Sequence, residues 1–377
     1  MRKYILIFFA IAAALIFAVL QFNKNISENS NGIPEADMSI RTIEPNNNLS
    51  YSAWIPDWAT GAGFSSLKTK KDLFNSISPV WYEVKEDGSL VKKIPAQSAE
   101  LLRFCEEKDI EVVPSIAMFD HEIFTKVLQS EENFKRHVDA IISEVRLFDY
   151  AGVDLDYEST KLSDKNKYFE FLQQLAGKLH AVDKKLVVTV LSQWGDDIEY
   201  PSLPETRKVQ DWSEIAKYAD EIRIMSYDYT SASAQFPGPI APLEWVEKII
   251  AYAAKKIPPE KTVLGIHLYS YEWSAAVEAP IFHPDFDSNP SVEKPAASYT
   301  FETVQKILAA NQGEKLDFQG ENIYIYQTER EGSKLYKVLV YIDPVGVSDR
   351  EALATRYGLK GVSYWRLGGE GELLQKD

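Results

Sequence analysis

The stretch AGVDLDYES, residues 151–159, places three carboxylates at every second position, namely Asp154, Asp156 and Glu158. Residues two apart in a β-strand share one face, so these three side chains point the same way and the apolar residues between them point the other way. Carboxylates held close together in a poorly solvated interior do not all ionise, so at least one keeps a proton. Glu158 ends the run and is therefore the candidate general acid.

Two structural explanations of the same alternation stay open at this point. An edge strand with a solvated acidic face would show the same pattern. Alternatively, a buried cation could pair with one of the carboxylates. Among the strands predicted below, Arg223 is the one lysine or arginine, so it is a possible structural partner for this acidic face.

From Tyr51 onward, short apolar runs alternate with longer segments of helical periodicity. Eight strands with intervening helices predict a parallel (β/α)8 barrel, that is, a TIM barrel. A doubly wound open sheet is the alternative, although the G-x-G-x-x-G and Walker phosphate-binding patterns are absent. The predicted strands are Ser52–Pro56, Ile77–Val84, Glu111–Ala117, Gly152–Tyr157, Leu186–Leu191, Glu221–Tyr227, Thr262–Leu268 and Gly361–Trp365. The predicted helices are Ala96–Lys108, Glu132–Phe148, Lys165–Val182, Trp212–Tyr218, Pro242–Lys256 and Asp349–Tyr357.

One connection is too long for a barrel loop, because roughly ninety residues separate the last two predicted strands. Within it, Asn322–Thr328 and Leu335–Ile342 alternate like antiparallel strands, and Thr300–Ala310 has the pattern of a short helix. We expect a small α+β insertion after the seventh strand, at about residues 272–342, that forms one wall of a cleft.

The first residues differ in kind from the rest. Arg2 and Lys3 precede an uncharged apolar run, which is typical of a secretory signal peptide or an N-terminal membrane anchor over residues 1–22. Residues 23–48 are polar and are expected to form a flexible linker before a barrel at 49–377. This arrangement predicts an exported protein, extracellular or at the cell surface, whose N-terminal segment contacts the membrane if it is retained.

Composition limits the partners and cofactors. The formal net charge of −15 disfavours nucleic acid and is compatible with a neutral glycan. Cys105 is the single cysteine, and the five histidines show no metal-ligand spacing, so we expect no metal, no disulfide and no cofactor. We expect a monomer.

Four motifs together resemble glycoside hydrolase family 18. GVDLDYE is similar to the family signature D-G-x-D-x-D-x-E on the fourth barrel strand, and MSYDY at 225–229 is similar to the M-x-Y-D motif. GVSYW at 361–365 resembles the eighth strand, and PGPIAP at 237–242 with Trp245 and LGI at 264–266 resembles the branch of bacterial spore-cortex and cell-wall glucosaminidases. That branch also carries an insertion after strand seven.

The resemblance implies a retaining glycosidase that acts on β-1,4 bonds of N-acetylglucosamine-containing glycans, either peptidoglycan or chitin. Glu158 would be the general acid and base, and Asp156 would accept a hydrogen bond from the acetamido N–H of the substrate. Asp154, below Asp156, would be the third catalytic carboxylate. Tyr227 would donate to the acetamido oxygen, and Asp228 would position that group. Trp365 would form the floor of the sugar site and Met225 would line it. Further aromatic residues near strand ends would extend the sugar-binding walls: Trp54, Trp81, Tyr82, Trp194, Tyr229 and Trp273.

The chain departs from the family signature at one position, because Ala151 stands where the first aspartate is expected. That change keeps an alternative open, namely a catalytically inactive, lectin-like glycan-binding protein on the same barrel. A membrane-tethered assembly factor is a second alternative, although the repeats expected of such a protein are absent.

Overall fold

The computed structural model describes residues 46–93, 98–275, 293–330 and 332–374. The expected leader or anchor at 1–22 lies outside the described residues, as does most of the expected linker at 23–48. In the part of the chain that is described, no helix is both long and apolar enough to cross a membrane.

Eight parallel strand positions close into a barrel. β1 pairs with β15 on one side and with β2 on the other, so the sheet has no gap between its first and last strands. The predicted barrel is thereby confirmed and the open doubly wound sheet is excluded. The strands are β1 (Ser50–Pro56), β2 (Ser76–Val84), β4 (Glu111–Val112) with β5 (Ser115–Met118), β6 (Gly152–Tyr157), β7 (Lys185–Leu191), β8 (Glu221–Met225), β9 (Thr262–His267) and β15 (Gly361–Trp365), and a short β3 (Leu90–Lys92) pairs antiparallel with β2.

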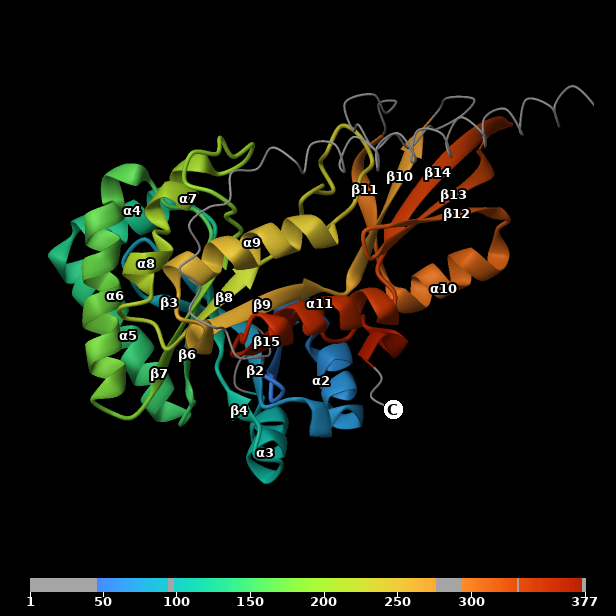
Figure 1. Ribbon diagram of the computed structural model, residues 1–377. Coiled ribbons are helices and arrows are strands. Elements are labelled where there is room, and N and C mark those ends of the chain that lie inside the picture. Colours follow the sequence, from blue (N-terminus) through green and yellow to red (C-terminus); the bar gives the residue numbers. More distant parts are fainter. Residues whose placement is uncertain (1–45, 94–97, 276–292, 331, 375–377) are drawn as a thin grey trace, which may run out of the picture.

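Helices cover the outer face of the barrel (Figure 1). Several begin at a residue whose side chain accepts a hydrogen bond from the first turn, as Ser98, Asp120 and Ser130 do. Their apolar faces pack on the outward side chains of the strands, and the two sets form one large hydrophobic core. The helices are α2 (Thr60–Thr69), α3 (Ala99–Glu107), α4 (His121–Gln129), α5 (Glu131–Leu147), α6 (Lys165–His180), α7 (Pro204–Val209), α8 (Trp212–Ile215), α9 (Leu243–Lys256) and α11 (Pro344–Arg356).

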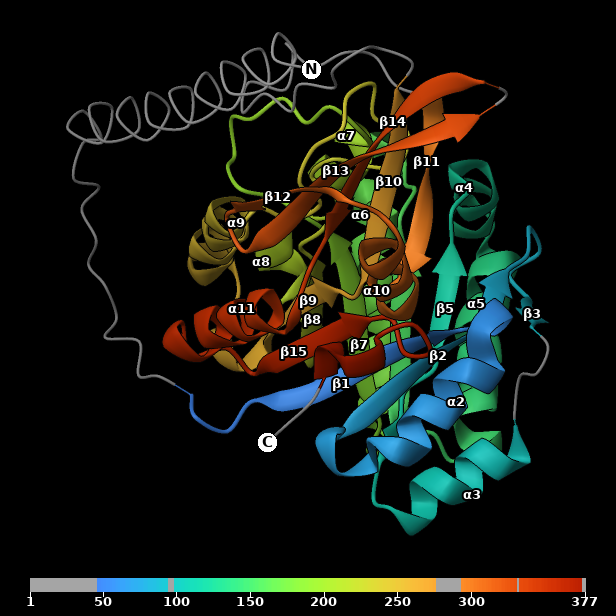
Figure 2. The same ribbon diagram turned by 90° about the vertical axis from the view of Figure 1, so that its right-hand side faces the viewer.

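A second, antiparallel sheet with its own helix lies between β9 and β15 in the sequence, as the long connection predicts. Figures 1 and 2 show it standing beside one end of the barrel. The predicted strand pair and helix are present as β13, β14 and α10, whereas the sequence pattern did not reveal β10, β11 and β12. The elements are β10 (Tyr269–Ala275), β11 (Glu293–Thr300), α10 (Phe301–Ala310), β12 (Gly313–Phe318), β13 (Glu321–Arg330) and β14 (Ser333–Tyr341), in the sheet order β11-β10-β14-β13-β12.

A buried ionic cluster joins this sheet to the barrel. Glu321, at the start of β13, lies 2.9 Å from the His267 Nε2 atom at the end of β9 and 3.9 Å from the Arg350 guanidinium on α11. All three side chains are almost completely inaccessible to solvent. Because buried charges are costly unless they are paired, this cluster fixes where the second sheet sits.

Candidate active site

A cavity of about 700 Å³ opens where the carboxyl ends of the barrel strands meet the second sheet. Active sites of (β/α)8 barrels lie at this end of the strands. The lining residues able to do acid–base chemistry or to contact a sugar are Trp54, Asp57, Trp58, Glu83, Lys93, Phe119, Asp156, Glu158, Met225, Tyr227, Asp228, Tyr269, Tyr271, Tyr299, Trp365 and Arg366.

Asp154 and Asp156 belong to β6, and Glu158 directly follows it; β6 lies between β5 and β7 and is buried along its whole length. The edge-strand explanation is therefore excluded. Asp154 is fully buried, Asp156 is almost fully buried at the base of the cavity, and Glu158 follows the strand end on the cavity wall. The three side chains thus form a column that rises from the barrel interior to the cavity.

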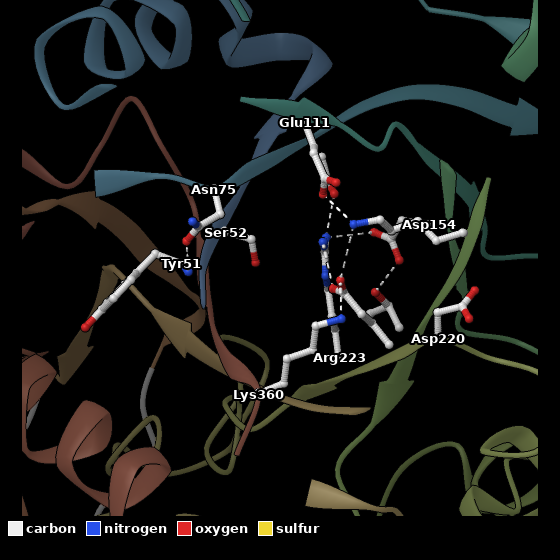
Figure 3. Close-up of polar contacts among 12 residues, drawn as sticks. Tyr51, Ser52, Asn75, Glu111, Asp154, Asp220, Arg223 and Lys360 are labelled. Carbon is white, nitrogen blue, oxygen red and sulfur yellow. Dashed lines mark hydrogen bonds and ion pairs between the residues drawn. The ribbon is translucent and has the colours of Figure 1, made fainter. Parts of the chain in front are cut away.

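Asp154 is held by hydrogen bonds from three other strands. Its oxygens accept from Trp54 Nε1 at 2.9 Å, Ser115 Oγ at 2.6 Å and Thr189 Oγ1 at 2.7 Å. A guanidinium nitrogen of Arg223, on β8, lies 3.8 Å from the same carboxylate (Figure 3). The possible ionic partner for the acidic face is therefore present, at the bottom of the column.

The surroundings of Asp156 and Glu158 favour the protonated form of each carboxyl group. Burial raises the pKa of Asp156 well above its usual range, and the neighbouring carboxylates of Glu158 and Asp154 raise it further. Burial and the carboxylate of Asp228 raise the pKa of Glu158 to about 7, while the Arg207 cation opposes that shift. Glu158 therefore carries a proton at neutral pH in part of the molecules, as a general acid requires.

Tyr227 and Asp228 reach the same cavity from the end of β8. Asp228 has a φ of 59°, a left-handed conformation that aspartate tolerates better than most residues. Its Oδ1 atom accepts hydrogen bonds from the hydroxyls of Tyr269 and Tyr271, both on β10. Partial desolvation by the cavity walls raises the pKa of Asp228, and these two hydrogen bonds oppose that shift. The residue itself remains exposed at the cavity surface.

A glycine on the neighbouring strand makes room for Tyr227. A Cβ atom at Gly265, on β9, would lie 3.2 Å from Cε1 of the Tyr227 ring and 2.4 Å from the carbonyl oxygen of Ile224. The glycine thus allows β8 and β9 to approach where the tyrosine enters the cavity. This residue lies within the LGI sequence that the resemblance singled out.

Some of the expected sugar-binding residues line the cavity. Trp365 ends β15 beside Trp54, with the two ring centroids 6.0 Å apart, and Met225 lies at the end of β8. The sequence pattern did not single out two exposed aromatic residues that also line the cavity, Trp58 and Phe119. Each lies one or two residues beyond a strand end, which is the signal that would have identified them.

Other expected sugar-binding residues lie away from the cavity. The Trp81 side chain is fully buried against Tyr150, and the Tyr82 hydroxyl donates to Glu144 on α5. The rings of two more pack on Trp245, in helix α9, and not on the cavity wall; they are Trp194 and Tyr229. Trp273 is also fully buried, in the core of the second sheet.

Two cationic side chains, Lys93 and Arg366, also line the cavity. The cavity holds an ion-paired lysine, Lys93, which lies 3.4 Å from Asp57 and 2.5 Å from Glu83. Arg366 stacks on the Trp58 ring at 4.1 Å. No cluster of three or more histidine, cysteine or acidic side chains with metal-binding geometry occurs among the described residues.

The sequence model for glycosyl hydrolases family 18 matches residues 16–370. The chain belongs to this family. The family 18 chain is 23% identical over 338 residues to the uncharacterized glycosylase YvbX of Bacillus subtilis (strain 168), with 84% of this chain and 87% of the relative covered. It is 22% identical over 305 residues to the cortical fragment-lytic enzyme of the same organism, covering 76% of this chain and 63% of that enzyme.

Solved structures show the same fold. The chitinase from Chromobacterium violaceum ATCC 12472 superposes with a TM-score of 0.73 at 21% identity, covering 86% of this family 18 chain and 96% of that chain. The spore cortex-lytic enzyme SleL of Bacillus megaterium QM B1551 superposes with a TM-score of 0.72 at 18% identity, covering 86% of this chain and 72% of that enzyme. The protein is accordingly a glycoside hydrolase, similar to chitinases and to cortex-lytic enzymes.

Proposed function

We propose that this family 18 hydrolase is a retaining glycosidase that cleaves β-1,4 bonds of N-acetylglucosamine-containing glycans, with Glu158 as general acid and base. One observation carries the proposal. Glu158 lies on the cavity wall at the carboxyl end of β6 with its pKa raised to about 7. A carboxyl group with such a pKa can give a proton to the glycosidic oxygen and take one back from water near neutral pH.

The proposed mechanism uses the substrate as its own nucleophile, one of the exceptions to catalysis by two carboxylates. Glu158 protonates the leaving oxygen while the carbonyl oxygen of the 2-acetamido group attacks the anomeric carbon, giving an oxazolinium ion. Asp156 accepts a hydrogen bond from the acetamido N–H, and Tyr227 donates one to the acetamido oxygen, while Asp228 positions the group. Ionised Glu158 then removes a proton from water as that water attacks the anomeric carbon. The oxazolinium ring opens, and the anomeric configuration of the substrate is retained.

Two glycans fit this chemistry, and both carry the required acetamido group. Similarity to the cortical fragment-lytic enzyme favours peptidoglycan, and the chitinase fold likeness is compatible with chitin. We further propose that the protein acts outside the cytoplasm, because basic residues and an apolar run precede the barrel. Fractionation of cells that express the full chain tests this location, and recovery in the cytosol contradicts it.

The test of catalysis compares three proteins on a 4-methylumbelliferyl chitobioside and on purified peptidoglycan. They are the wild type, Glu158→Gln and a matched control, Glu314→Gln, which changes an exposed glutamate on β12. We expect cleavage of at least one substrate by the wild type and the control, and a loss of about 100-fold or more in Glu158→Gln. A chitobioside whose reacting sugar carries a free 2-amino group should resist cleavage.

Three outcomes contradict parts of the proposal. Cleavage by Glu158→Gln at the wild-type rate removes Glu158 from the chemistry. Cleavage of the amino sugar removes the acetamido group as the nucleophile. Binding of both glycans without cleavage by the wild type supports the lectin alternative.

A further inference from the structure

Arg223 is a buried cation inside the barrel, directly below the carboxylate column. Its side chain is fully inaccessible to solvent, and it donates a hydrogen bond to Ser78 Oγ on β2. In the strand order of the barrel, β2 lies opposite β8, so the guanidinium spans the interior. Figure 3 shows Arg223 beside Asp154 at the centre of this polar network.

The side chains around Asp154 supply it with hydrogen-bond donors and one positive charge. The titratable groups that face it are Arg223 on β8, Tyr227 beyond the end of β8 and Asp156 on its own strand. The remaining contacts are the uncharged donors of β1, β5 and β7. The indole N–H of Trp54 and the guanidinium can only donate. The indole hydrogen bond and the 3.8 Å contact of the guanidinium both involve Oδ2 of Asp154, so that oxygen acts as an acceptor.

The Arg223 cation is balanced from below. Another of its nitrogens lies 3.6 Å from Glu221, which is itself paired with Lys360 at 2.8 Å and lies 4.0 Å from Lys185. The charges therefore alternate from the base of the barrel up to Asp154. With Glu221 shared among three cations, Arg223 retains positive charge to stabilise the aspartate above it.

We propose that Arg223 is a positioning residue that keeps Asp154 ionised and thereby leaves the proton of the aspartate pair on Asp156. Chain-specific residues motivate this role, because Ala151 removes the carboxyl group expected below Asp154 in the family signature. Asp154 is therefore the lowest carboxyl group of the column, and the charged group beside it is the Arg223 guanidinium. The inference rests on the proposed function for its catalytic consequence.

The consequence concerns Asp156 and Glu158. Among the described residues, the buried Oδ1 atom of Asp156 has no hydrogen-bond partner, so no neighbouring side chain holds that oxygen. The raised pKa of Asp156 agrees with this placement of the proton. A protonated Asp156 can donate to Glu158 after Glu158 has lost its proton, while its other oxygen accepts the acetamido N–H.

The experiment compares the pH profile of kcat/KM for wild type, Arg223→Met and Arg223→Lys. Removal of the cation disfavours the ionised form of the aspartate pair, so the acid limb of the Arg223→Met profile should move to higher pH by about one unit, with about tenfold lower activity on that limb. Arg223→Lys keeps the charge and should restore the acid limb even if its maximal rate is lower. An unchanged acid limb in Arg223→Met overturns the proposal, as does an equal shift in both variants.

A second measurement does not require an Arg223 variant to fold. In a Glu158→Gln background, infrared spectroscopy at neutral pH should show the carbonyl band of one protonated, buried carboxyl group. That band should vanish in Asp156→Asn, and a band that remains in Asp156→Asn overturns the proposal. If the wild type hydrolyses no glycan, the proposed function fails, but the infrared bands still decide where the proton lies.

Discussion

Glu158 illustrates how an active-site residue costs stability. Its pKa of about 7 in the folded protein lies above the usual glutamate pKa of 4.5, so between these pH values the folded state binds the proton that the unfolded state has lost. The contribution of this group to stability is fully present below the unfolded pKa and is lost as pH rises through the folded pKa. Ionisation of Glu158 in the cavity therefore lowers the stability of the folded protein, and the residue is retained for its role in catalysis.

Because ionisation of Glu158 destabilises the folded protein, replacing this residue should affect stability in a pH-dependent way. We expect Glu158→Gln to raise the melting temperature at pH 8, where wild-type Glu158 is ionised in the cavity. At pH 5, where wild-type Glu158 is protonated, we expect a much smaller effect. Thermal unfolding of both proteins at the two pH values checks this, with Glu314→Gln as the control. A rise in melting temperature that is equal at both pH values would be inconsistent with the raised pKa.

The sequence located the acidic column because its alternation is local, but it did not locate the partners of Asp154. Those partners come from four other strands, β1, β5, β7 and β8, and their meeting depends on the stagger of the closed barrel. Single-sequence periodicity says which face of a strand a residue occupies, not which residue of another strand it meets. Arg223 was identified as a possible partner solely because a charge inside a predicted strand requires one.

At the scale of elements, β10 links the barrel to the second sheet and carries two side chains of the site. A single residue separates it from β9, so Tyr269 and Tyr271 reach Asp228 directly from the barrel edge. The sequence prediction placed the insertion further along the chain and left β10 unrecognised. Polar and aromatic residues alternate in it without the apolar run that marks a barrel strand.

We predict that Tyr269→Phe lowers kcat/KM by about tenfold or more, because a hydrogen bond to a charged group contributes about 1.5–3 kcal/mol. Tyr271→Phe should have a similar or smaller effect, and the double variant should lose more than either, since Asp228 then has neither donor. Tyr168→Phe is the matched control, because the Tyr168 hydroxyl has no hydrogen-bond partner among the described residues. Wild-type kinetics in the double variant would show that the orientation of Asp228 is unimportant.

The aromatic residues of β2 show why element-level prediction has a limit. Trp81 and Tyr82 precede the strand end, where sugar-binding residues are expected. The pairing of β2 with β5 shifts register between Val80 and Tyr82, and Val80 and Glu83 line the cavity instead. A bulge changes which side chains face inward, and sequence alternation alone does not reveal it.

At the scale of the whole molecule, the cavity exists because the second sheet is fixed against the barrel. Glu321 accepts a hydrogen bond from the backbone N–H of Ala241 and faces His267 and Arg350, so one carboxylate joins the loop before α9, the end of β9, β13 and α11.

We predict that Glu321→Gln lowers the free energy of unfolding by about 3 kcal/mol, because it leaves buried Arg350 without its carboxylate. Activity should fall as well, since His267 is two residues from Tyr269. Urea unfolding measures the change in stability. Glu302→Gln is the control, because Glu302 forms an exposed ion pair with Lys306 whose loss should cause no measurable change. An unchanged unfolding midpoint in Glu321→Gln would mean that apolar packing alone holds the second sheet in place.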